Sequence, residues 1–110
     1  ATRKLHQNDI LFSMVRPYLR NIALVDDAYN NAIASTGFYV ITPGIGYFHK
    51  FLFYMMLSNY VVDGLNTFMK GDNSPSINNG HIENYLYPLP PLQEQQRIVA
   101  QIERLFEQLK

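Results

Sequence analysis

The chain has 110 residues, enough for one domain with a modest core, and its 47% apolar and 16% charged residues exclude a disordered chain. It has no cysteine, which excludes a disulfide framework and a thiolate metal site and is consistent with a reducing compartment. A formal net charge of zero, without a basic stripe, argues against a free-standing, non-specific nucleic-acid binder. The longest apolar run, residues 51–62, is too short and too interrupted to span a bilayer, and no signal peptide appears.

The N-terminal part of the chain predicts strands. "DILFSMV" is an apolar run between polar residues, which indicates a largely buried strand. Pro17 disfavours a continuous ladder, so a turn there leads into a second strand, and "DDAYNN" has the composition of a further turn. The third strand has Gly37 as a point where it can kink, and it stops at Pro43. The three predicted strands cover residues 9–15, 21–25 and 32–44.

The period of the apolar residues then becomes helical, from Tyr47 to Met69, with Asn59 or Gly64 as the point where two helices separate. Residues 71–80 are rich in Asn, Ser and Gly and predict a loop. "HIENYLYPL" predicts a short turn or helix followed by a last strand over residues 85–89. This order indicates an α+β domain with a small mixed sheet and packed helices.

A long C-terminal helix of the coiled-coil type follows. Pro90-Pro91 end the domain and suit a first helical turn, and Glu94 lies where the helix dipole favours an anion. The expected units are therefore residues 1–89 and residues 90–110. An alternative is that the helix folds back on its own domain. The residues expected to form the helix-pairing seam are apolar and recur at heptad-like spacing: Leu92, Ile98, Val99, Ile102, Leu105, Phe106 and Leu109.

No segment of the sequence predicts catalysis or metal binding. "DNSPSINNGHIE" places oxygen-bearing side chains at the spacing of a calcium loop, but Ile77 stands where that loop needs Gly and Pro75 lies in its interior. "GIGYFHK" lacks the third glycine of a dinucleotide fingerprint, and the three histidines lack metal-ligand spacing. No serine sits in a nucleophile elbow.

Two segments do carry binding chemistry. "RPYLR" combines two guanidinium groups with a flat ring, and "KGDNSPSINNG" is rich in amides and hydroxyls. Arg and Lys suit phosphate or guanine, Asn suits adenine, and Ser suits either a base or phosphate. The alternative is that Asn, Ser, Gly and Pro are simply loop residues. The candidate DNA contacts are Arg16, Tyr18, Arg20, Lys70, Asn73, Ser74, Ser76 and Asn78.

Three stretches of the chain resemble the specificity subunit of type I restriction–modification systems. They are "NDILFSMVRPYLRNIALV", "ASTGFYVITP" and "FMKGDNSPSINNGHIENYLYPLPPLQEQQRIVAQIE". The motifs that match the family best are the G-x-x-x-P-S-I-N loop and the P-L-P-P-L-x-E-Q-x-R-I-V segment at the start of the helix. They occur in the order and at the spacing found in the family. The chain opens without Met, so we expect a piece of a longer protein.

The resemblance implies a non-catalytic module in which a recognition domain reads half of a split DNA sequence and a spacer helix follows it. In that family the helix packs against its counterpart and sets the distance between two recognition domains. It also helps to hold methyltransferase subunits, which bind S-adenosylmethionine, and restriction subunits join indirectly. A prokaryotic cytoplasmic location is implied, with no membrane partner, and either a second recognition half or a homodimer completes the site.

Two features depart from the family. A family recognition domain is longer at its N-terminal side, so the chain resembles its second half with the start of the helix. The zero net charge is the second departure and does not help the DNA-binding interpretation, although in the family DNA is clasped jointly with methyltransferase subunits, so this piece need not supply all the counter-charge. Two alternatives stay open: a recognition domain fused to catalytic domains in one chain, and an interaction module whose helix mediates oligomerisation without DNA.

Overall fold

The structure, a computed structural model, describes residues 3–26, 33–34, 37–72 and 74–109. It confirms the α+β class. The strands are β1 (Arg3–Lys4), β2 (Ile10–Ser13), β3 (Ile22–Leu24), β4 (Ile33–Ala34) and β5 (Phe38–Ile41). The helices are the 3₁₀ helix η1 (Pro17–Leu19), α1 (His49–Leu57), α2 (Asn59–Asp72), α3 (Asn79–Asn84) and α4 (Leu92–Gln108).

The main sheet has three strands in the order β3-β2-β5, and β2 is its centre. Ile10 of β2 lies opposite Leu24 on one side and Ile41 on the other. Ile10 and Phe12 are fully buried, because the central strand of a sheet covered by helices points its alternate residues into the core. All described strand pairs are antiparallel, whereas a mixed sheet was expected.

The predicted third strand, residues 32–44, is two strands in different sheets. β5 pairs with β2, and β4 pairs with β1, which the sequence did not predict. The described strands end at Ile41, before Pro43, because proline cannot donate to a ladder. The predicted turn at residues 26–31 lies mostly outside the described residues.

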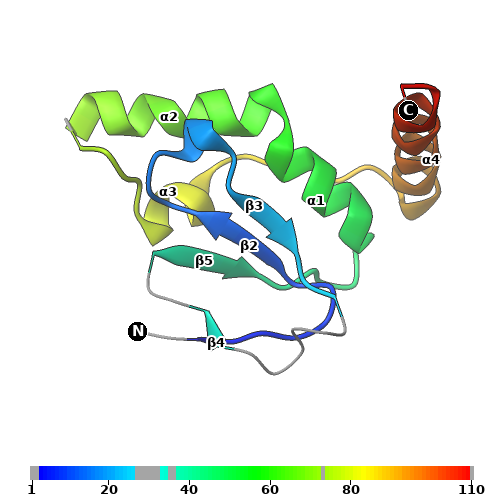
Figure 1. Ribbon diagram of the computed structural model, residues 1–110, viewed down its shortest axis with the longest axis horizontal. Helices are drawn as coiled ribbons and strands as arrows, with labels where there is room; N and C mark the ends of the chain where they lie inside the picture. The colour runs from blue at the N-terminus through cyan, green and yellow to red at the C-terminus, as the bar shows by residue number, and fades with distance from the viewer. Residues whose placement is uncertain (1–2, 27–32, 35–36, 73, 110) are drawn as a thin grey trace.

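Helices α1 and α2 cover one face of this sheet (Figure 1). They separate at Ser58, next to one of the two expected positions, and Gly64 lies within α2. The Ser58 hydroxyl donates to the carbonyl of Met55 at 2.6 Å and accepts from the N–H of Val61 at 3.3 Å. One side chain therefore serves the end of α1 and the first turn of α2, which explains the break.

The expected last strand over residues 85–89 is wrong, because this segment is irregular. Pro88 and Pro90 have no N–H to donate. The tyrosines of this segment instead bond through their hydroxyls: Tyr87 donates to the Ile82 carbonyl at 2.7 Å, and Tyr85 donates to the Tyr60 carbonyl at 2.6 Å. The segment is thereby held against α2 and α3 without a partner strand.

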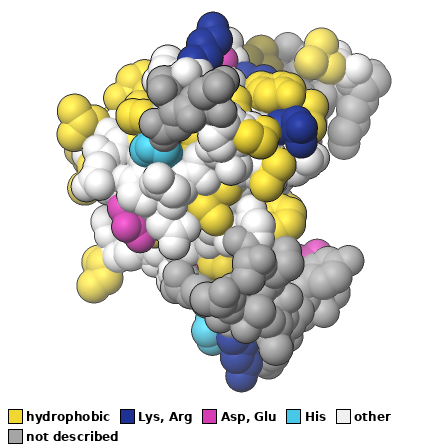
Figure 2. Space-filling model, turned by 90° about the vertical axis from the view of Figure 1, so that its left-hand side faces the viewer, with side chains coloured by type: hydrophobic (Ala, Val, Ile, Leu, Met, Phe, Trp, Pro, Cys, Tyr) yellow, Lys and Arg dark blue, Asp and Glu magenta, His cyan; other side chains and the backbone are white. Residues whose placement is uncertain are grey.

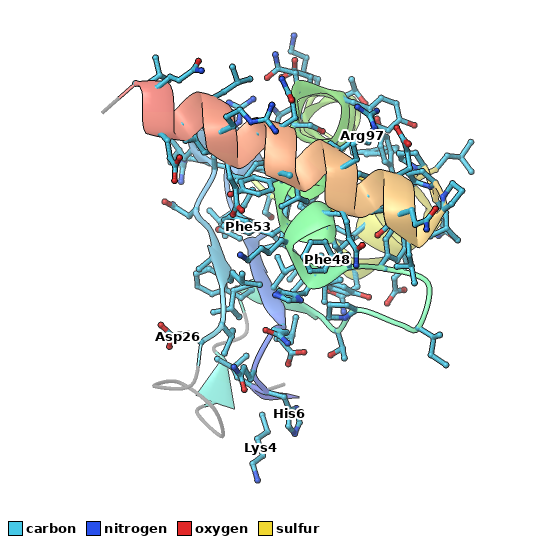
Figure 3. The ribbon with its side chains drawn as sticks, turned by 90° about the vertical axis from the view of Figure 1, so that its right-hand side faces the viewer. Lys4, His6, Asp26, Phe48, Phe53 and Arg97 are labelled. Carbon is cyan, nitrogen blue, oxygen red and sulfur yellow. The ribbon has the colours of Figure 1, made fainter. Side chains whose placement is uncertain are left out.

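Helix α4 begins directly after Pro91, as predicted, and carries Glu94 in its first turn, where that carboxylate pairs with Arg97. Figure 3 shows α4 lying across α1, with Phe48 and Phe53 below α4 in this view and Arg97 above it. Gln95 and Val99 are buried. The fold-back alternative therefore describes the first turns of α4. None of the helices in the described ranges is long and apolar enough to cross a membrane.

Candidate nucleic-acid interface

The two candidate binding segments lie side by side, although about 60 positions separate them in the chain. Val15 and Ser76 form an isolated antiparallel bridge. The N–H of Arg16 donates to the carbonyl of Pro75 at 2.8 Å, and the N–H of Ile77 donates to the carbonyl of Met14 at 2.9 Å. The "RPYLR" segment and the "SPSIN" loop therefore form one surface.

The "RPYLR" segment is a single 3₁₀ turn between two left-handed residues. Arg16 has φ 47° and Arg20 has φ 52°, a conformation that non-glycine residues adopt at a cost of about 1–3 kcal/mol each. Pro17 is buried and anchors the turn, whereas Tyr18 is 49% exposed. The turn therefore presents Arg16 and Tyr18 to solvent on a rigid support.

Arg20 is tied to the helices. Its guanidinium donates to the carbonyl of Leu57 at 3.2 Å and to the side-chain oxygen of Asn59 at 2.6 Å. These contacts join the turn to the junction of α1 and α2. These bonds explain the orientation of the turn. Because they occupy the Arg20 guanidinium, Arg20 is less free than Arg16 to contact a ligand.

The second segment is also internally bonded. Ser74 accepts at its hydroxyl from the N–H of Ser76 at 3.3 Å, and Ile77 is buried and anchors the loop. Asn78 caps α3: its side-chain oxygen accepts from the N–H of His81 at 3.0 Å, and its own N–H donates to His81 Nδ1 at 3.1 Å. Lys70 is exposed near the end of α2. Asn73 lies outside the described residues.

A groove beside this loop was not predicted from the sequence. It has a volume of about 590 Å³ and is lined by Tyr60, Phe68, Asn78, Gly80, His81, Asn84, Tyr85 and Leu86. The rings of Phe68 and His81 stack with centroids 4.3 Å apart. The signal in the sequence was "NYLY", whose tyrosines two positions apart were assigned to a strand.

The face that carries the end of α2 and α3 has its basic side chains at the margins, and its middle is hydrophobic and uncharged polar (Figure 2).

Burial raises the pKa of Tyr87 and of Tyr85, so these phenols stay neutral and act as hydrogen-bond donors. Among the described residues no cluster of His, Asp or Glu could hold a metal ion.

The expected seam residues divide between two strips of α4. Val99 is buried against the domain, and the ring of Phe106 lies 6.0 Å from that of Tyr54 on α1. Glu103, on the same strip, accepts from the Tyr54 hydroxyl at 3.2 Å and pairs with Lys50 at 3.6 Å. On the neighbouring strip, Ile98 and Ile102 are half-buried and Leu105 and Leu109 are exposed. Leu92 is exposed at the start of the helix.

The sequence and the fold match known proteins of one kind. The family model described as "Type I restriction modification DNA specificity domain" matches residues 2–110. The chain is 31% identical over 106 residues to the specificity subunit of the type I restriction enzyme EcoDI of Escherichia coli, covering 96% of this chain and 23% of that subunit.

The crystal structure of the HsdS subunit from Thermoanaerobacter tengcongensis superposes with a TM-score of 0.86 at 39% identity, over 96% of this chain and 28% of that one. A structure described in terms of the complex assembly and conformational transition of the type I R-M system matches equally well. The chain thus spans about a quarter of the length of these relatives. With nearly all of its residues matched by the family model, the chain belongs to the family of type I restriction–modification DNA specificity domains.

Proposed function

We propose that this chain is part of a module that reads one half of a split DNA site and directs a methyltransferase, and through it a restriction subunit, to that site. The observation that carries the proposal is the bridge between Val15 and Ser76, which joins the exposed Arg16–Tyr18 turn to the Ser74–Asn78 loop in a chain of this family. Guanidinium, amide and hydroxyl groups on one surface are the chemistry that phosphates and base edges require.

Within this surface we rank the contact residues by the exposure of their side chains and by the hydrogen bonds that already hold them. Arg16, Tyr18 and Lys70 are exposed and would meet DNA first. Ser74, Ser76 and the remaining amide hydrogens of Asn78 would follow, with Asn73 as a further candidate. Arg20 would contribute indirectly, because its hydrogen bonds to Leu57 and Asn59 fix the turn to the α1–α2 junction. Zero net charge fits joint clasping of DNA, because partner subunits would supply the rest of the basic surface.

The strip of α4 that runs from the half-buried Ile98 and Ile102 to the exposed Leu105 and Leu109 supports the second half of the proposal. Ile98, Ile102, Leu105 and Leu109 follow one another at steps of four, three and four, the spacing of a helix-pairing seam. Residues 90–110 would then begin the spacer, and a second recognition half or a second copy would supply the opposing helix. S-Adenosylmethionine would be held by the methyltransferase partner in the bacterial cytoplasm, and this chain would carry out no chemistry.

The test is to express the full-length parent with the methyltransferase encoded beside it in a methylation-deficient host. The mass of the purified complex and the sequence positions of methylated bases in the host DNA are then measured. A stable complex that methylates one split sequence supports the proposal. Methylation by the parent alone, through a catalytic domain in its own chain, would identify the fused enzyme. A complex that neither methylates nor protects DNA would leave an interaction module.

A further inference from the structure

We infer that Gln95 is a positioning residue that sets the angle at which the spacer helix leaves the recognition domain. The consequence of this angle for DNA recognition rests on the proposed function. That Gln95 fixes the angle rests on the hydrogen bonds of its side chain. Gln95 is a polar side chain in the first turns of α4, and its exposed fraction is 0%. A buried amide of this kind is stable only if its polar atoms are bonded.

The amide of Gln95 bonds to three separate backbone groups. Its oxygen accepts from the N–H of Phe48, the residue that precedes α1, at 2.7 Å. Its nitrogen donates to the carbonyls of Gly46 and Pro90, both at 2.8 Å. One side chain therefore ties together the loop before α1, the beginning of α1 and the proline linker.

The bonds of Gln95 are directional, and this distinguishes it from its apolar neighbours. Val99, one turn later, is buried but can tolerate rotation of the helix, because apolar contacts have no preferred direction. A planar amide that satisfies one donor and two acceptors allows only one orientation of the helix. Pro90 and Pro91 stiffen the linker through their fixed φ and leave the carbonyl of Pro90 to be satisfied by Gln95.

Contacts further along α4 extend the same docking but lie nearer to solvent. Glu103 meets Tyr54 and Lys50, and Phe106 meets Tyr54. Exposed ion pairs and partly exposed rings contribute little to a fixed angle. A small change at Gln95 becomes a large displacement at the far end, since 17 residues of helix extend about 25 Å. In the proposed complex this displacement would alter the separation of the two recognition halves.

The test replaces Gln95 in the full-length parent by Met, which has a similar length but can neither accept nor donate these three bonds. Gln95→Glu keeps the acceptor and loses both donations. Gln96→Met is the matched control, since Gln96 is an exposed glutamine of the same helix. Spin labels at Ala23→Cys and Gln108→Cys, both exposed, report the angle by pulsed electron resonance in a parent without other cysteines.

We expect the label-to-label distance distribution of Gln95→Met and Gln95→Glu to broaden or shift, while Gln96→Met matches the wild type. An unchanged distribution in a folded Gln95 variant would overturn the inference. So would the failure of both variants to fold, since Gln95 would then serve the fold itself. These outcomes do not depend on DNA binding.

A second readout uses the DNA site identified by its methylation. Duplexes carry both half-sites at the natural spacing, or with one base pair added or removed. Wild type and Gln96→Met should favour the natural spacing, whereas Gln95→Met should methylate the three duplexes more nearly equally. A Gln95→Met complex that loses activity on all three in the same proportion would show lost stability without lost positioning, and would contradict the inference.

Discussion

The ring of Tyr85 covers the position where a side chain on Gly64 would have to lie. A Cβ built on Gly64 would overlap the hydroxyl and ring carbons of Tyr85, and that hydroxyl donates to the Tyr60 carbonyl one turn earlier in α2. The glycine in the middle of a helix is therefore required by a tyrosine from the segment that leads to α4. This contact fixes the irregular segment against α2, where a strand had been predicted.

Replacing Gly64 by Ala should destabilise the domain, although Ala favours a helix over Gly by about 1 kcal/mol. Overpacking of this kind costs about 1–3 kcal/mol, and the overlap with Tyr85 involves rigid ring atoms. Urea denaturation measures the change. Gly44→Ala is the control, because an added Cβ there meets nothing within 4 Å. Equal stability of the two variants would contradict the assigned packing.

Asn78 caps α3 and is also a candidate DNA contact. Replacing it by Asp separates these two roles. Asn78→Ala should cost about 1 kcal/mol, because the cap on α3 is lost. Asn78→Asp keeps the accepting oxygen and the stability, but it loses the amide donor and adds a negative charge. Thermal unfolding and DNA affinity are measured for both. DNA affinity of Asn78→Asp equal to wild type would remove Asn78 from the contact surface.

Arg16 and Arg20 should differ in the salt dependence of DNA binding. Arg16→Ala should lower affinity and reduce the slope of log K against log salt by about 1, as expected for one lost phosphate contact. Arg20→Ala should instead lower stability by about 1 kcal/mol, because its bonds to Leu57 and Asn59 are lost. Fluorescence anisotropy across salt concentrations measures the slope. A larger slope change for Arg20→Ala would reverse these assignments.

The domain should lose stability in alkali through Tyr87. Burial is the largest cause that raises the pKa of Tyr87 above its ordinary value of 10.0, with further contributions from neighbouring tyrosines. The unfolded chain releases this proton first, so the contribution is complete below pH 10 and is lost as pH rises through the folded pKa. Tyr87→Phe should flatten the decline of stability above pH 10, after the loss of its bond to Ile82 is subtracted. Tyr18→Phe, at an exposed position, should leave the decline as in wild type.

Replacing Ile102 and Leu105 by Asp should abolish helix pairing, because two carboxylates would be buried in an apolar seam. The mass of the assembled full-length parent and its methyltransferase measures this. Gln101→Asp with Gln108→Asp adds the same charge at exposed positions of α4 and should leave the assembly intact. Unchanged assembly of the Ile102 and Leu105 variant would place the seam elsewhere.

Much of the secondary structure was predictable from local patterns. The apolar run of β2, the turn at Pro17, the helical period from Tyr47 and the start of α4 after Pro91 depend on neighbouring residues, and all four were found. The failures came where the pairing partner is distant. The segment "NYLYPL" has the alternation of a strand, but Pro88 and the ring of Tyr85, which meets α2, prevent pairing.

By itself the sequence determined the α+β class, the family and the order of turn, loop and helix, because composition, periodicity and motif spacing are properties of neighbouring residues. Only the tertiary structure decided that the turn at Arg16 meets the loop at Ser76, that Arg20 binds the α1–α2 junction, and that α4 is tied down by Gln95. These relationships join segments far apart in the chain. They depend on the direction of individual hydrogen bonds and on the space between packed side chains, and no local pattern of residues encodes either.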